Sequence, residues 1–117
     1  MAVPSDCIFC RIGAGQISAK VVWQDEDIFA FEDLNPQAPV HVLVIPKRHF
    51  VSLNDVTNGG QDLLGRLLEA ATVVAKNKGI AESGYRVVAN TGPNGGQTVS
   101  HLHLHVLGGR QMKWPPG

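Results

Sequence analysis

The chain has 117 residues, and a domain of this length buries roughly two-thirds of the surface that its unfolded form exposes. Ten basic residues balance ten acidic residues without any run of like charge, which argues against a nucleic-acid-binding surface or a membrane-surface patch. The first six residues lack a secretory signal pattern, and no apolar run approaches the roughly 20 residues that span a bilayer. We therefore expect a cytoplasmic protein whose partner is a small molecule or another protein.

The first half of the chain predicts one short helix and three strands. Residues 7–15 begin with apolar side chains and end in glycines, as expected of one or two helical turns. Residues 21–23 and 28–31 flank a polar turn and predict a β-hairpin. After a proline-containing loop at residues 33–39, the apolar run at 40–45 predicts a well-buried strand that ends at Pro46.

The second half predicts a long helix followed by two strands. Between residues 61 and 78 the apolar side chains follow one helical face, at Leu63, Leu64, Leu67, Leu68, Ala71, Val74 and Ala75. Residues 85–89 and 101–107 predict strands that are joined by a glycine-rich loop. No repeat or linker divides the sequence, so residues 1–117 are expected to form a single α+β domain with five strands, one long helix and one short helix.

Three histidines alternate with aliphatic residues in the last predicted strand. Because successive side chains of a strand point to opposite faces, His101, His103 and His105 are expected to share one face, with the long helix on the other, and to leave the core to Leu102, Leu104 and Val106. Imidazoles near neutral pH act as nucleophiles, proton carriers or metal ligands. His101 and His105 would stand about 13 Å apart, too far to share one ion. Mutual hydrogen bonding of the rings is the structural alternative.

The loop before the histidines contains Gly92, Gly95 and Gly96, which allow the backbone to turn sharply and expose amide groups to an anion. A plain connector between two strands is the alternative interpretation. No Gly-Lys-Ser/Thr follows, so this is not a Walker loop. Thr98 adds a hydroxyl close to the histidines and favours a phosphate-binding role.

Residues 90–105, the turn at 33–40 followed by His41, and the ending Trp-Pro-Pro-Gly resemble the histidine triad (HIT) superfamily, specifically its HINT branch of nucleotide-binding phosphoramidases. The resemblance implies a five-stranded antiparallel sheet that dimerises into a ten-stranded sheet. It also implies cleavage of purine nucleoside 5′-phosphoramidates or acyl-adenylates, with release of AMP or GMP. A nucleotide-sensing adaptor with little turnover is the alternative function.

The resemblance also implies catalytic roles. His103 would attack phosphorus and form a nucleotidyl-histidine intermediate, while His105 would hydrogen-bond phosphate oxygens. The backbone at His101 would orient the central ring, and Thr98 would stand near the bridging atom, where many relatives have serine. His41 would support the triad from a neighbouring strand, although a satisfied core histidine is an equal alternative.

For nucleotide binding, the resemblance places the base between Ile8, Phe9, Ile12, Phe31 and Leu34. The Asp33 carboxylate would accept hydrogen bonds from both ribose hydroxyls, unless it only closes an Asx turn before Pro36. Ordinary core packing is the alternative interpretation of these apolar side chains. The remaining predicted nucleotide contacts are Asn90, Gly96, Gln97, Thr98, Val99, His103, His105 and Trp114.

The chain has two cysteines, Cys7 and Cys10, and this pair departs from the usual HINT pattern. It resembles the zinc-carrying bacterial histidine triad proteins, which implies a structural Zn²⁺ held by these thiols with His49 and His101. Simple buried thiols and a redox pair are the alternatives. No organic cofactor is expected.

The resemblance further implies a two-fold homodimer in which the C-terminal tail, residues 108–117, crosses the interface and brings Trp114 to the partner's active site. The strand before the long helix and the helix itself would pair across the dimer. Neither nucleic acid nor membrane is an expected partner.

Overall fold

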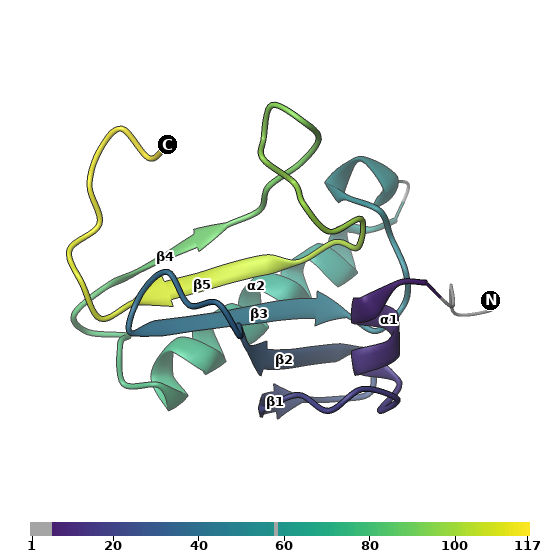
Figure 1. Cartoon of the computed structure of the whole chain (residues 1–117), viewed down its shortest axis with the longest axis horizontal. Helices are drawn as coiled ribbons and strands as arrows, with labels where there is room; N and C mark the ends of the chain where they lie inside the picture. Colours follow the sequence, from purple (N-terminus) through teal and green to yellow (C-terminus); the bar gives the residue numbers. More distant parts are fainter. Residues whose placement is uncertain (1–5, 58) are drawn as a thin grey trace.

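The computed structural model describes residues 6–57 and 59–117. The expected absence of a secretory signal concerns residues 1–6, of which all but Asp6 lie outside the described residues. A five-stranded antiparallel sheet has the order β1-β2-β3-β5-β4, with one helix in front of it and one behind (Figure 1). The elements in chain order are α1 (Ile8–Gly13), β1 (Val21–Gln24), β2 (Ile28–Glu32), β3 (Val40–Pro46), a 3₁₀ turn (Leu53–Asp55), α2 (Gln61–Asn77), β4 (Tyr85–Val88) and β5 (Leu104–Gly108).

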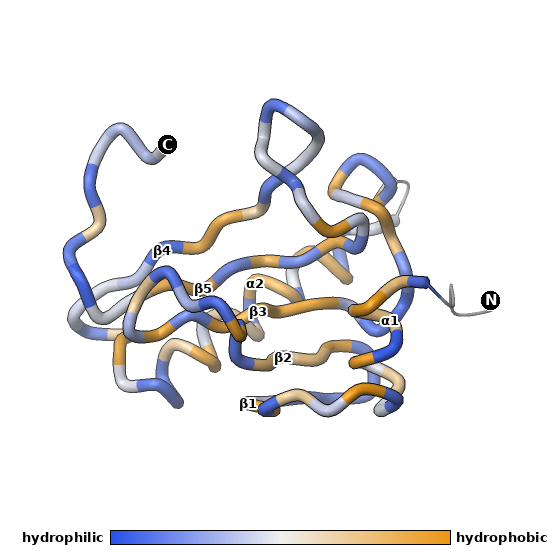
Figure 2. The backbone as a smooth tube through the Cα atoms, in the orientation of Figure 1, coloured by the Kyte–Doolittle hydropathy of each residue, from blue (hydrophilic) through white to orange (hydrophobic). Residues whose placement is uncertain are grey.

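Each face of the sheet carries its own apolar cluster. Strand β3 is central, and its side chains alternate: Val42 and Val44 pack toward α2, whereas Leu43 and Ile45 pack toward α1. Burial on both faces explains why residues 42–45 of this strand are consecutive apolar side chains rather than an alternating pattern. Most of the tube along β3 is correspondingly coloured as hydrophobic in Figure 2. The predicted α+β arrangement, with the long helix on one face only, is confirmed.

Helix α2 confirms the predicted periodicity and its C-terminal end. Gly79 follows with φ +73°, and its amide donates to the Lys76 carbonyl, as in a glycine-terminated helix. Leu67, Ala71 and Val74 are buried against the sheet, but Leu68 remains 55% exposed. Leu68 belongs to the predicted apolar face of the helix, but the sheet does not cover it.

The last strand is shorter than predicted. Strand β5 begins at Leu104, three residues later than the expected start, because the ladder with β3 begins at the pair Val44↔Leu104. Upstream, the Leu102 amide donates to the Phe50 carbonyl instead, so residues 101–103 are irregular. The predicted alternation nevertheless holds, since Leu102, Leu104 and Val106 belong to the cluster under α2.

The expected pairing of the strand before α2 across a dimer is wrong. That strand is β3, and both of its edges are already hydrogen-bonded, to β2 on one side and β5 on the other. The strands with one open edge are β1 and β4. Within the described residues, no helix has the length and apolar character needed to cross a membrane.

Candidate active site and metal centre

His103 is held in one defined orientation. Its Nδ1 lies 2.7 Å from the His101 carbonyl oxygen, and because a carbonyl only accepts, Nδ1 carries the proton. In the neutral ring, the lone pair is then on the other nitrogen, Nε2. The ring is 4% exposed, and Phe9 of α1 makes an edge contact with it at a centroid distance of 5.1 Å. His103 is thus an oriented imidazole, and in its neutral form Nε2 is the nitrogen available as a nucleophile.

A second pair of imidazoles forms a directional hydrogen-bond relay. The Gln37 amide donates to His41 Nδ1 at 3.0 Å, so the proton of His41 sits on Nε2. His41 Nε2 lies 2.8 Å from His105 Nδ1, which must accept that proton in a hydrogen bond. His105 then carries its own proton on Nε2. The relay makes His105 a hydrogen-bond donor at Nε2. His105 also lines an apolar cavity, which is described below.

Burial sets the charge of this relay. Desolvation lowers the pKa of His105 to about 4, an effect that the neighbouring imidazoles His103 and His41 strengthen and Asp33 opposes. Desolvation also lowers the pKa of His41, against the opposing attraction of Asp33. Both rings are therefore neutral near pH 7, as the relay requires.

A cavity of about 590 Å³ lies beside these histidines, between α1, the end of β2 and the loop that follows β2. It is predominantly apolar, and its polar lining includes Asp33, His41, Thr98 and His105. The structure brings most of the predicted nucleotide-binding residues together here, namely Ile8, Phe9, Ile12, Phe31, Asp33, Leu34, Thr98, Val99 and His105. Ile17, Ser18, Ala19 and Leu43 also line it, and no sequence motif singled them out.

Asp33 forms the Asx turn that is one of its two expected roles, and its contact with the ribose stays a prediction. Its Oδ1 accepts from the Asn35 amide at 2.8 Å, which is an Asx turn, while Oδ2 lies 3.4 Å from His41 Nε2. The carboxylate still borders the cavity. Leu34 beside it is 98% exposed and borders the cavity without packing.

Other predicted nucleotide contacts do not line this cavity. Gln97 uses its amide within the protein: Oε1 accepts from the Gly92 amide, and Nε2 donates to the carbonyls of Val51 and Val99. Asn90 Nδ2 donates to the Gly95 carbonyl. These bonds brace the glycine-rich loop.

Trp114 lies apart from the cavity. It is 82% exposed, with the Arg86 guanidinium 6.0 Å from its ring centroid. It belongs to the tail that runs away from the sheet in Figure 1.

Four predicted metal ligands converge at the N-terminal end of α1. His101 Nδ1 lies 3.3 Å from Cys7 Sγ, 3.4 Å from Cys10 Sγ and 3.2 Å from His49 Nδ1, and Cys10 Sγ lies 3.2 Å from His49 Nδ1. Four N and S ligands of one tetrahedral zinc ion stand about 3.3–3.8 Å apart. The observed spacing and the two-cysteine, two-histidine donor set therefore fit Zn²⁺.

The surroundings of the cluster also suit a cation. His101 Nε2 donates to the Pro46 carbonyl at 2.8 Å, which leaves the Nδ1 lone pair facing the cluster. Burial lowers the pKa of His101 to about 4, so the ring is a neutral ligand. Burial and the neighbouring Cys7 raise the pKa of Cys10 to about 12. At neutral pH, this thiol would ionise only with a cation bound beside it.

Asp33, His41 and His105 form a second group of ligand-type atoms. Here the relay argues against a metal: His41 Nδ1 is occupied by the Gln37 amide, so Nε2 holds a proton and not a free lone pair. The backbone donors and acceptors of Gln37, Pro46 and His101 carry no signature in the sequence, which is why sequence reasoning missed Gln37 and Pro46.

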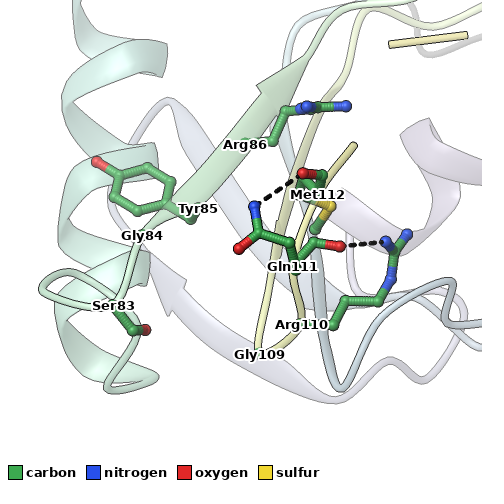
Figure 3. A pocket seen from close by; sticks show the side chains of 8 residues that line it. All are labelled: Ser83, Gly84, Tyr85, Arg86, Gly109, Arg110, Gln111 and Met112. Atoms are coloured by element: carbon green, nitrogen blue, oxygen red, sulfur yellow. Dashed lines mark hydrogen bonds between the residues drawn. The ribbon is translucent and has the colours of Figure 1, made fainter. Parts of the chain in front are cut away.

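A polar cavity of about 580 Å³ lies elsewhere, between the start of β4 and the tail. Figure 3 shows Arg86 and Arg110 on its two sides, with Gln111 and Met112 between them. Both guanidinium groups are engaged by main-chain carbonyls, Arg86 by Lys113 and Arg110 by Gln37 and Gln111. This cavity contains no histidine and is separate from the relay.

The fold and its site define a class of protein in which an antiparallel sheet presents neutral, oriented imidazoles beside an apolar cavity. The family model described as HIT domain matches residues 14–112, and the chain belongs to this family.

The relatives agree over nearly the whole length. The chain is 48% identical to the protein named adenylylsulfatase HINT1 of Arabidopsis thaliana, over 99% of this chain and 81% of the relative. It is 50% identical to a 14 kDa zinc-binding protein of Zea mays, over 97% and 89%. The crystal structure of a HIT family hydrolase from Legionella pneumophila Philadelphia 1 matches with a TM-score of 0.93 and 51% identity, over 96% of this chain and all of that chain.

Proposed function

We propose that this protein is a hydrolase that cleaves purine nucleoside 5′-phosphoramidates or acyl-adenylates through a nucleotidyl group carried on His103. One observation carries the proposal: the His101 carbonyl accepts from His103 Nδ1 at 2.7 Å and leaves Nε2 as the nucleophile. The names of the relatives, a hydrolase and an adenylylsulfatase, support nucleotide hydrolysis in general.

Substrate binding follows from the cavity. The base packs between Ile8, Phe9, Ile12 and Phe31, and the Asp33 carboxylate accepts hydrogen bonds from the ribose hydroxyls. The phosphate then faces His105, whose Nε2–H donates to its oxygens. Thr98 at the cavity wall places a hydroxyl near the bridging atom.

Chemistry proceeds in two displacements. In the first, the Nε2 lone pair of His103 forms a bond to phosphorus while the phosphorus–nitrogen bond to the leaving amine breaks. The amine nitrogen takes a proton from the Thr98 hydroxyl, which recovers one from solvent water. The His101 carbonyl stabilises the positive charge that appears on the His103 ring. In the second, a water oxygen bonds to phosphorus, the bond to Nε2 breaks, and the water releases a proton to solvent. The products are the amine and the nucleoside monophosphate.

The cysteine–histidine cluster takes no part in bond breaking in this proposal. Cys7, Cys10, His49 and His101 would hold Zn²⁺, which would supply a structural cross-link between α1 and the segment before β5. The name of the maize relative supports this assignment.

We also propose a homodimer, with β4 as the pairing strand in place of β3. Strand β4 has one open edge, and Leu68 on α2 is a large apolar side chain left more than half exposed. A partner pairing along β4 would produce the expected ten-stranded sheet, and residues 108–117, including Trp114, would reach the second subunit. Sedimentation of the wild type and of Leu68→Glu tests this: a dimer that becomes monomeric is expected, and a monomeric wild type would refute it.

The function is tested with a fluorogenic adenosine phosphoramidate, in which the fluorophore is the leaving amine. Wild-type protein is expected to turn over, whereas His103→Ala should lose at least about 1,000-fold in kcat because the nucleophile is gone. Binding of AMP to His103→Ala, measured by calorimetry, should persist. Denaturing mass spectrometry of a rapidly quenched reaction should find the nucleotidyl adduct on His103. The adaptor alternative predicts AMP binding with negligible turnover by the wild type.

A further inference from the structure

The metal-ligand cluster and the nucleophile meet in a single residue. The His101 ring faces both cysteine sulfurs through Nδ1, while the main-chain carbonyl of the same residue accepts the His103 Nδ1–H bond. Any movement of the His101 ring and main chain is therefore transmitted to the orientation of His103.

The segment that carries this carbonyl is not held by the sheet. Residues 101–103 precede β5, and the ladder with β3 starts only at Leu104. In this segment, the Leu102 amide is anchored to the Phe50 carbonyl, and the fully buried His101 ring is anchored to the Pro46 carbonyl and to the cluster. The ring thus does the anchoring that a strand ladder would otherwise do.

Helix α1 forms a second link between the cluster and the nucleophile. Phe9 lies between the two cysteines in the sequence and makes edge contacts with His101, at a centroid distance of 5.9 Å, and with His103, at 5.1 Å. The cysteines and the side chain that packs on the nucleophile therefore move as one short helical turn.

The cluster also has access to solvent. Cys7 and His49 line a cavity of about 390 Å³ together with Asp6 and Ser100, and this cavity shares Ile8, Thr98 and Val99 with the nucleotide cavity. Two of the four ligands therefore border a cavity next to the one proposed for the nucleotide.

We propose that Cys7, Cys10 and His49 are positioning residues for the nucleophile: the loaded cluster clamps His101, and the His101 carbonyl keeps His103 Nε2 aimed at phosphorus. The inference rests on the proposed role of His103. It predicts that metal loading governs kcat, while affinity for the nucleotide is set mainly by the apolar cavity.

The test uses Cys7→Ser, because serine retains the N-cap hydrogen bond that Cys7 accepts from the Cys10 amide but removes the thiolate ligand. Asp6→Asn, a neighbour on the same cavity wall outside the ligand set, is the matched control. Cys7→Asp restores a cap and an oxygen ligand. Zinc content by native mass spectrometry, kcat for the fluorogenic phosphoramidate and Kd for AMP are measured for each.

Cys7→Ser is expected to lose its zinc and about tenfold or more in kcat, with a change in the Kd for AMP below about threefold. Asp6→Asn should match the wild type, and Cys7→Asp should regain part of both the zinc and the kcat. An unchanged kcat in zinc-free Cys7→Ser, or a parallel loss of kcat and AMP affinity, would overturn the inference.

A readout independent of turnover is the tautomer of His103, observed by long-range ¹H–¹⁵N NMR in the presence of AMP. The wild type should show a single Nδ1–H tautomer, and Cys7→Ser should show a mixture; a single Nδ1–H tautomer in both would also overturn the inference. If Cys7→Ser does not fold, chelation of the wild type and restoration of zinc give the same comparison. If the wild type shows no turnover, the proposed function fails, and the tautomer alone decides this inference.

Discussion

His41 Nε2 lies 2.8 Å from His105 Nδ1, across the pair of neighbouring strands β3 and β5. Because the Gln37 amide donates to the far nitrogen of His41, the direction of this bond is set by the backbone. The relay explains how His105 can donate to a phosphate from Nε2 at neutral pH while the ring stays uncharged.

Removing the relay donor should impair catalysis. We expect His41→Phe to lower kcat/KM by about tenfold or more, since His105 loses the hydrogen bond that selects its tautomer. His41→Gln places a side-chain amide donor in a similar position and should recover part of the loss. Steady-state kinetics with the fluorogenic phosphoramidate would show this, and wild-type kinetics in His41→Phe would contradict the relay.

Stability should depend on pH through the buried imidazoles. The pKa of His105 is lowered to about 4 and that of His41 is also lowered, whereas unfolded histidine titrates near 6.5. As the pH falls from 6.5 toward 4, the unfolded chain takes up protons that the folded chain refuses, so the free energy of unfolding decreases.

Thermal unfolding between pH 4 and 7, with chelator present throughout to exclude metal effects, measures this slope. The midpoint should fall with falling pH in the wild type, and His105→Gln should show a flatter dependence. Parallel slopes for the two proteins would show that His105 is not held neutral.

Metal removal should destabilise the fold. A ligand that binds only the folded state at 1,000 times its Kd adds about 4 kcal/mol, which corresponds to about 10–20 °C in Tm for a domain of this size. In scanning calorimetry, we expect the Tm of the chelated protein to rise by an amount of that order when Zn²⁺ is restored. The Tm of His49→Ala should rise much less, and an equal rise would show that the metal binds at another site.

Asp33 offers a test of ribose recognition. Asp33→Asn keeps an oxygen to accept from the Asn35 amide, so the turn should persist while the charge is lost. The KM for the ribonucleotide substrate should rise about tenfold, and the KM for its 2′,3′-dideoxy analogue should change little. Equal changes for the two substrates would leave Asp33 with a turn-forming role only.

The conformation of the glycine-rich loop leaves no room for a side chain at residue 95. A Cβ there would stand 2.3 Å from the Thr91 carbonyl oxygen and 2.8 Å from its nitrogen, both main-chain atoms. Gly95→Ala should therefore lower both Tm and kcat/KM. Gly65→Ala, in α2 with open space around it, should instead stabilise by about 0.5–1 kcal/mol. Destabilisation of similar size in both variants would contradict the argument.

Much of the fold was predictable from local patterns. The 3.6-residue period of α2, the glycine that ends it and the largely apolar run of β3 each report local geometry and burial, and each is confirmed. The expected start of β5 was wrong because alternation reports which face a side chain occupies, not where hydrogen bonding begins. Side chains alternate through Leu102 although its amide bonds to Phe50 and not to a strand.

The sequence alone predicted the residue types of the site, namely three alternating histidines and a Cys-X-X-Cys pair. This was possible because the identity and spacing of these residues indicate their chemistry. Only the tertiary structure separated their surroundings: the His101 ring faces the cysteines, the His103 ring is bonded to the His101 carbonyl, and His105 lines the apolar cavity. The physical reason is that proton positions are set by backbone partners such as the carbonyls of His101 and Pro46 and the amide of Gln37. Every residue carries such groups, so they become specific only when the fold brings them within hydrogen-bond distance.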